Sequence, residues 1–209
     1  MQYYGESNFH LKDNQSPVTI ADLESSKLIV SLLEMETNFP VLSEERLVEY
    51  SSRKLWDTYW LVDPLDGTKE FINHHPEFTV NIALMEHGRP TLGVVFAPAL
   101  GNCWWASHGD GAFKDGHSII NILKKSNIIG VDSRYHSTEI VQAFFRKNNI
   151  TNIKSYGSSL KMCSVAEGSA DIYPRLNGTM EWDTAASEII LNESGCSILS
   201  WPDRSLLQY

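Results

Sequence analysis

Two aspartates, Asp63 and Asp66, stand three residues apart where a buried strand is expected to end. The aromatic and aliphatic run 59–62 predicts that strand, and Pro64 has no N–H for a sheet ladder, so we expect the strand to stop there. Carboxylates so placed can converge on one hard cation, with the carbonyl of Leu65 as a further oxygen ligand. The spacing therefore predicts a metal site at a strand end.

The two residues that follow suit phosphate chemistry. Gly67 permits close backbone approach, and free N–H groups there can hold a phosphate. The Thr68 hydroxyl can position a water molecule. Asp-Pro and Asp-Gly are also common turn dipeptides, so the two aspartates alone are a weak signal. The full run predicts metal-assisted phosphate chemistry.

The stretch 60–71, WLVDPLDGTKEF, resembles the signature of the inositol monophosphatase superfamily, which are metal-dependent and lithium-sensitive phosphatases. Many members have Asn where Glu70 stands. The ending Lys69-Glu70-Phe71 instead resembles the CysQ-type branch, the 3′(2′),5′-bisphosphate nucleotidases. The resemblance implies Mg²⁺ as the cofactor, since hard oxygen ligands select Mg²⁺ over Zn²⁺.

The resemblance also implies a set of metal and catalytic residues. Segments 43–45 and 181–186 match two further motifs of the family. The metal ligands would be Glu44, Asp63, the carbonyl of Leu65, Asp66 and Asp183. Asp22 and Thr68 would orient the attacking water. Taken alone, Asp183 would be an ordinary helix cap and Asp22 a helix-surface residue or cap.

Substrate contacts are expected largely in the second half of the chain. Segments 157–161 and 173–175 resemble the nucleotidase branch, and His136 follows a strand where relatives place a nucleotide-contacting histidine. A helix start is a natural anion site, and an arginine suits a phosphate fork. Taken singly, Lys161 and Arg175 would be solvated charges. The predicted substrate-binding residues are Gly67, Thr68, His136, Ser158, Ser159, Lys161 and Arg175.

Composition narrows the class of protein. The chain has 209 residues, a net charge of −9 and three widely spaced cysteines. The acidic balance and the lack of a basic stripe argue against nucleic-acid polymers as partners. No run is long or apolar enough to span a bilayer, which leaves peripheral membrane association open. No signal-peptide pattern is present, and the cysteines suit reduced thiols, so we expect a cytoplasmic protein, either a monomer or a homodimer.

Hydrophobic periodicity predicts an α+β half over 1–121 and an α/β half over 122–209. The first half should contain a helix over 19–37, with Leu28, Ile29, Leu32 and Leu33 as its apolar face, and strands at 41–42, 59–62, 78–85, 91–96, 102–106 and 112–114. The second half should contain strands at 128–132, 153–156, 170–173 and 196–199, and helices at 137–148, 159–167 and 183–194.

The family resemblance implies a layered α-β-α-β-α sandwich with the site between the halves. It also implies a longer first helix, of which only 1–5 remain, and a strand beyond Tyr209, so we expect truncated ends.

These observations predict a Mg²⁺-dependent phosphatase that converts 3′-phosphoadenosine 5′-phosphate, a by-product of sulfate assimilation, to AMP and phosphate. Two alternatives stay open. One is an inositol or sugar monophosphatase with the same site. The other is a non-catalytic, truncated remnant that binds nucleotide or metal.

Overall fold

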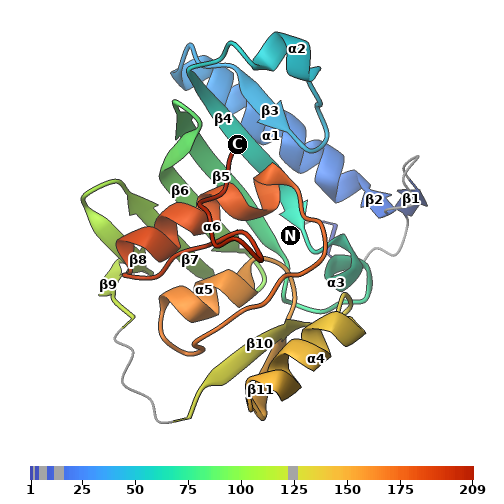
Figure 1. Ribbon diagram of the computed structural model, residues 1–209. Helices are drawn as coiled ribbons and strands as arrows, with labels where there is room; N and C mark the ends of the chain where they lie inside the picture. The colour runs from blue at the N-terminus through green and yellow to red at the C-terminus, as the bar shows by residue number, and fades with distance from the viewer. Residues whose placement is uncertain (2, 5–8, 12–16, 122–126) are drawn as a thin grey trace.

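The computed structural model describes residues 1, 3–4, 9–11, 17–121 and 127–209. The chain forms five layers in the order α-β-α-β-α, which confirms the expected architecture (Figure 1). The layers are α1 (Ile20–Glu36), a seven-stranded sheet, the helices α5 (Leu160–Ala166) and α6 (Glu181–Glu193), a two-stranded parallel sheet of β10 (Ile129–Ser133) and β11 (Asn152–Tyr156), and α4 (Glu139–Lys147).

The large sheet lies entirely in the first half of the chain. Its strands follow sequence order: β3 (Val41–Ser43), β4 (Thr58–Asp66), β5 (Thr79–Glu86), β6 (Arg89–Ala97), β7 (Asn102–Ser107), β8 (Gly111–Lys114) and β9 (His117–Ile119). Only the pairing of β3 with β4 is parallel; the others form an antiparallel meander. The short elements β1 (Phe9–Leu11), β2 (Pro17–Thr19), α2 (Tyr50–Arg53) and α3 (Thr68–Ile72) were not predicted from the sequence.

One hydrophobic cluster joins the two halves. It contains Leu61 and Val95 from the large sheet and Cys163, Ile189 and Ile190 from α5 and α6. The main core thus takes side chains from both the predicted halves, 1–121 and 122–209. The division of the chain into these two halves stays a prediction. Residue 122 lies outside the described residues, as do residues 2 and 5 of the expected helix remnant. No helix in the described part of the chain is long and apolar enough to cross a membrane.

Strand β4 does not end at Pro64, contrary to the prediction. It continues to Asp66, and its pairing with β5 shifts so that Asp63 opposes Asn81 while Asp66 opposes Thr79. Two residues of β4 thus oppose one on β5, so β4 carries one extra residue, which is a β-bulge. The bulge accommodates the missing N–H of proline and bends the strand at the point where the two aspartates project.

The buried face of α1 agrees with the prediction only in part. Of the predicted apolar residues, Ile29 and Leu33 pack against the cluster of Val30, Val41 and Val62. Leu28 and Leu32 are 61% and 49% exposed, whereas Asp22, Ser26 and Val30 are buried. The buried side is polar near the start of α1, where the Ser25 hydroxyl donates to Pro64 O in β4 at 2.9 Å. The Ser26 hydroxyl likewise lies 3.1 Å from that of Ser43, the last residue of β3.

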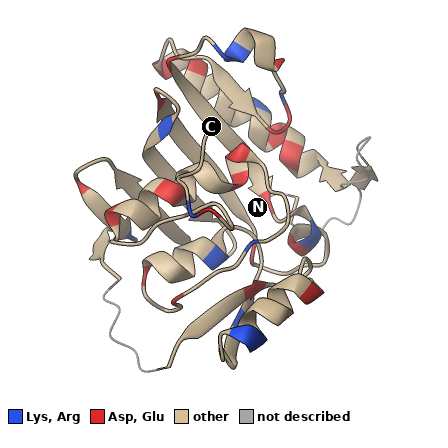
Figure 2. Ribbon diagram, viewed as in Figure 1, with Lys and Arg blue, Asp and Glu red and all other residues tan. Residues whose placement is uncertain are grey.

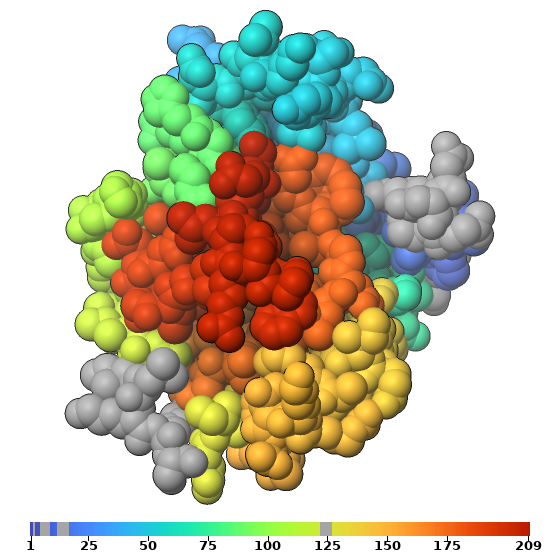
Figure 3. Space-filling view, in the orientation of Figure 1, coloured from blue at the N-terminus to red at the C-terminus, as the bar shows by residue number. Residues whose placement is uncertain are grey.

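Three other local predictions were wrong. The cap of α4 is Thr138 rather than Ser137, whose hydroxyl instead donates to Asp132. Segments 170–173 and 196–199 are not strands, and each makes one isolated bridge, at Ile172 and Leu199 respectively. The last residues instead lie across the face of α6 (Figure 3), where the Tyr209 hydroxyl donates to Glu188 at 2.7 Å.

Helix α6 packs directly on β6 at Gly93. A Cβ there would lie 2.4 Å from the backbone oxygen of Ala186 and 2.5 Å from Cγ2 of Ile189. Real Cβ atoms do not approach backbone atoms so closely, so the helix can approach the sheet only because this residue has no side chain.

We therefore expect Gly93→Ala to lower the free energy of unfolding by about 1–3 kcal/mol through overpacking. Gly178→Ala is a matched control, because a Cβ at Gly178 would meet nothing within 4 Å. Urea unfolding of the two variants measures the difference. Equal midpoints for Gly93→Ala and wild type would contradict this account of the packing.

Candidate active site

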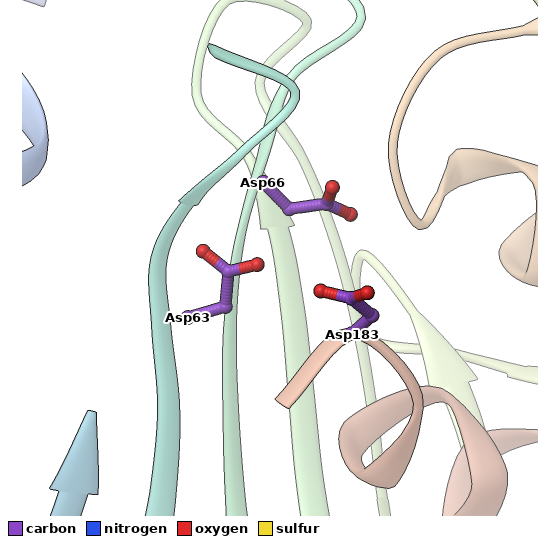
Figure 4. A group of neighbouring side chains, drawn as sticks. All are labelled: Asp63, Asp66 and Asp183. Carbon is purple, nitrogen blue, oxygen red and sulfur yellow. The ribbon is translucent and has the colours of Figure 1, made fainter. Parts of the chain in front are cut away.

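Three carboxylates meet where the end of β4 faces the first turn of α6 (Figure 4). Asp63 and Asp66 come from β4 and Asp183 from α6, and one oxygen of each lies within 4.8 Å of the others. In Figure 2, acidic segments of the ribbon occur at this junction. The aspartates were predicted as metal ligands from separate motifs, and the fold brings them together.

Among the described residues, each of the three carboxylates accepts hydrogen bonds on one oxygen only. Asp63 Oδ1 accepts from the Leu65 N–H at 3.0 Å, and Asp183 Oδ2 accepts from the Met180 N–H at 2.9 Å. All donors to Asp66 likewise fall on Oδ2. These bonds orient the three side chains. The second oxygen of each carboxylate is left for a ligand.

The cluster is electrostatically costly without a cation. Asp63 is only 1% exposed, and its pKa is raised well above the usual value by burial and then by the charges of Asp66, Glu44 and Asp183. Burial, followed by the charge of Asp66, raises the pKa of Asp183 to about 6. A divalent cation would relieve this repulsion, and an all-oxygen donor set fits a hard ion of the Mg²⁺ type. The residues present therefore fit a metal.

Glu44 and Leu65, the other two predicted ligands, line the same cavity as the three aspartates. Glu44 directly follows β3, and its N–H donates to Val62 O next to Asp63 at 3.1 Å. The neighbouring Glu45 lines a separate cavity against α1. The structure therefore places the first glutamate of the pair, and not the second, at the site.

Asp22 and Thr68, the predicted water-orienting pair, are in contact. The Thr68 hydroxyl donates to Asp22 Oδ1 at 3.2 Å. The other oxygen of Asp22 accepts from the backbone N–H of Thr19 at 2.7 Å, as part of the capping box of α1. Asp22 is thus both a helix-capping residue and the partner of Thr68, which leaves the lone pairs of the Thr68 hydroxyl to accept from water.

A cavity of about 720 Å³ extends from the acidic cluster toward the second half of the chain. All predicted substrate-binding residues line it: Gly67, Thr68, His136, Ser158, Ser159, Lys161 and Arg175. The two halves meet closely at its floor. Gly67 has a positive φ of 93°, and a Cβ on it would lie 3.2 Å from Cβ of Ser158.

Ser158 and Lys161 have polar groups that few protein partners satisfy. Ser158 is buried with a positive φ of 43°, and its Oγ has no hydrogen-bond partner among the described residues. Such strain in a residue other than glycine is typical of functional sites. The Lys161 ammonium is buried, donates to Ser158 O at 2.5 Å and lies 5.5 Å from the centre of the Tyr173 ring. Both groups are placed to bind an anion in the cavity.

His136 and Arg175 lie on the more open side of the cavity. Burial lowers the pKa of His136, and the positive charges of Lys69, Arg175 and Lys161 lower it further. All four of these basic side chains line the cavity. Arg175 also donates to Gly178 O at 3.3 Å.

Ser159 differs from the expectation of a substrate contact. It is fully buried, and its hydroxyl donates to Asp66 Oδ2 at 2.8 Å. In this arrangement Ser159 orients a carboxylate of the acidic cluster.

Several residues at the site were missed in the sequence. Asn81 on β5 donates to both Ser159 and Asp66. Glu77 Oε2 accepts hydrogen bonds from Arg134 Nε at 3.0 Å, from Arg134 Nη2 at 2.8 Å and from the Gly157 N–H at 2.8 Å. Glu77 thereby links the start of β5 to the loops that follow β10 and β11. Asn81 could have been found in the sequence, because it is a polar residue at an inward position of an otherwise apolar strand, and buried polar groups need hydrogen-bond partners.

The sequence profile of the inositol monophosphatase family matches residues 1–207, and the chain belongs to that family. It is 42% identical to the 3′(2′),5′-bisphosphate nucleotidase CysQ of Salmonella typhimurium and 41% identical to that of Escherichia coli, in each case over 93% of this chain and 80% of the relative. The solved structure of CysQ from Bacteroides thetaiotaomicron, a bacterial member of the family, matches with a TM-score of 0.86 and 39% identity over 95% of this chain and 81% of that one. An inositol monophosphatase of Thermotoga maritima matches with a TM-score of 0.80 and 29% identity over 93% and 76%.

The raised pKa values of Asp63 and Asp183 predict how stability depends on pH. Both groups hold protons more tightly in the folded chain than in the unfolded one, so their contribution to stability is greatest at low pH. The contribution of Asp183 is lost as the pH rises through about 6. Without metal, the melting temperature should fall as the pH rises from about 4 through about 6, and Asp183→Asn should reduce that fall. Excess Mg²⁺ should reduce it too, because metal binding favours the deprotonated ligands. Thermal unfolding in EDTA and in Mg²⁺ tests this, and an identical pH slope in Asp183→Asn would contradict it.

Proposed function

We propose that this chain is a metal-dependent 3′(2′),5′-bisphosphate nucleotidase that hydrolyses the 3′-phosphate of 3′-phosphoadenosine 5′-phosphate to AMP and phosphate. The single observation that carries the proposal is one cavity with an acidic cluster at one end and buried or strained anion-binding groups at the other. CysQ relatives at about 40% identity over most of the chain support the same activity.

The acidic end would carry out the chemistry. Mg²⁺ is the proposed cofactor, held by Asp63, Asp66 and Asp183 with Glu44 and the Leu65 carbonyl. When bound, it would polarise the phosphate and stabilise the leaving oxygen.

The chain's own residues would orient the nucleophile. The Thr68 hydroxyl, which donates to Asp22, would accept a hydrogen bond from water and aim the water at phosphorus in line with the leaving 3′-oxygen. No protein side chain would become phosphorylated.

The basic end would select the substrate. A bisphosphate nucleotide carries a second phosphate, and Lys161, Arg175 and His136 are available to bind it. Ser158 would donate its otherwise unpartnered hydroxyl, and the Gly67 loop would allow the phosphate to approach the backbone. The proposed enzyme is cytoplasmic and is either a monomer or a homodimer.

Asp63→Asn should abolish turnover while leaving the chain folded. A neutral amide cannot balance a divalent cation, whereas losing one buried negative charge relieves repulsion in the metal-free protein. We expect the rate to fall by about 10³-fold or more, as when a main electrostatic element of a transition-state site is removed. Phosphate release at saturating Mg²⁺ measures the effect, with circular dichroism as the check on folding. A folded variant with more than about a tenth of wild-type activity would exclude Asp63 as a metal ligand.

Lys161→Met should reduce kcat/KM for the bisphosphate nucleotide and spare a simple monophosphate. Methionine keeps the buried stem but removes the charge, and a charge-assisted contact is worth about 1.5–3 kcal/mol, or about 10-fold to about 150-fold. Arg175→Ala should act in the same direction. Lys154→Met is the matched control, because Lys154 also donates to one backbone carbonyl, of Ser169, but does not line the cavity.

The comparison uses 3′-phosphoadenosine 5′-phosphate and inositol 1-phosphate as paired substrates for each variant. Equal losses on both would assign Lys161 to the fold or to the shared phosphate site, and would exclude Lys161 as the group that selects the second phosphate. A wild-type preference for inositol 1-phosphate would favour the monophosphatase alternative. Inactivity on both, in a chain that melts cooperatively, would favour the non-catalytic alternative.

A further inference from the structure

The Ser159 hydroxyl lies where three segments of the chain meet. It donates to Asp66 Oδ2 at 2.8 Å, accepts from Asn81 Nδ2 at 2.9 Å and lies 3.3 Å from the carbonyl oxygen of Asp183. Ser159 and Asn81 are 0% and 1% exposed, so bulk water does not compete for these bonds. One hydroxyl therefore contacts three elements: β4 at Asp66, β5 at Asn81 and the first turn of α6 at Asp183.

The Asn81 amide reinforces the same contact. Its Nδ2 also lies 3.4 Å from Asp66 Oδ2, as does the hydroxyl of the buried Thr79. The other end of the amide, Oδ1, has no hydrogen-bond partner among the described residues. A buried amide whose oxygen has no hydrogen-bond partner costs stability. Packing alone therefore does not account for asparagine at this position, whereas the hydrogen bonds that its Nδ2 donates to Ser159 and Asp66 do.

The geometry points to a role for both residues in the metal site: we propose that Ser159 and Asn81 are positioning residues that fix the Asp66 carboxylate by Oδ2, keep Oδ1 available for the divalent cation, and so set the affinity of the site for that cation. Hydrogen bonds to the non-ligating oxygen of a carboxylate lock its rotamer and lower the entropy lost on metal binding. The inference rests on the proposed function only in requiring that the acidic cluster binds a metal.

The arrangement also connects metal binding to the substrate side of the cavity. Ser159 directly precedes α5. Its neighbour Ser158 lines the cavity, and the Ser158 hydroxyl has no hydrogen-bond partner among the described residues. The hydrogen bond from Ser159 to Asp66 thus fixes the position of the loop relative to the acidic cluster.

The test measures metal affinity directly. Mn²⁺, which carboxylate sites also accept, is titrated into the wild-type chain and the Ser159→Ala and Asn81→Ser variants, and free Mn²⁺ is followed by electron paramagnetic resonance. Ser164→Ala is the matched control: Ser164 is buried in α5, the helix that Ser159 precedes, but its hydroxyl donates to the backbone oxygen of Lys161 at 2.7 Å. We expect both test variants to weaken Mn²⁺ binding by about 10-fold or more, and the control to bind like wild type.

Activity gives a second readout that a purely structural defect would not produce. In Ser159→Ala, raising the Mg²⁺ concentration should restore most of kcat, because the loss lies in metal affinity. If Ser159→Ala does not fold, Asn81→Ser carries the test. Wild-type Mn²⁺ affinity in Ser159→Ala or in Asn81→Ser would overturn the inference alone. A wild-type chain that binds no Mn²⁺ would overturn the proposed function, and this inference with it.

Discussion

Electrostatic repulsion among Asp63, Asp66 and Asp183 is the interaction on which the site depends. Three carboxylates this close cannot all ionise cheaply in a buried place, as the raised pKa values of Asp63 and Asp183 indicate. The fold nevertheless holds them together with a bulged strand end and a helix first turn. Stability that is sacrificed in the metal-free chain is recovered when a cation binds, which makes metal binding and folding parts of one equilibrium.

The second requirement is that the two halves approach closely enough to share one cavity. Glycines permit this approach: a Cβ on Gly157 would lie 2.5 Å from Glu77 O and 2.6 Å from the Glu70 side chain. Polar contacts then hold the loops in place, through the ion pair between Glu77 and Arg134 and the Ser159 hydroxyl. Close packing at the glycines and these polar contacts therefore hold the two halves together where the cavity forms.

Helix α1 shows how the site alters ordinary packing. A helix that only covered a sheet would bury its leucines, yet Leu28 and Leu32 are exposed while Asp22 and Ser26 are buried. The polar residues face the strand ends, where Asp22 holds Thr68. Periodicity placed Ile29 and Leu33 against the core correctly. It misplaced Leu28 and Leu32, because it assigns the inward face by hydrophobicity and cannot recognise polar residues that face inward for chemistry.

The sequence alone determined the layered fold, the family and its nucleotidase branch, because a long motif restricts both the chain path and the chemistry. Local periodicity also located most strands, but it could not foresee that β4 continues through Pro64, since a bulge depends on the neighbouring strand. Only the tertiary structure showed that Ser159 bonds to Asp66 and that Asn81 supports it. Those contacts join residues 78 to 93 positions apart in the chain, and such partners are chosen by packing, which no local pattern records.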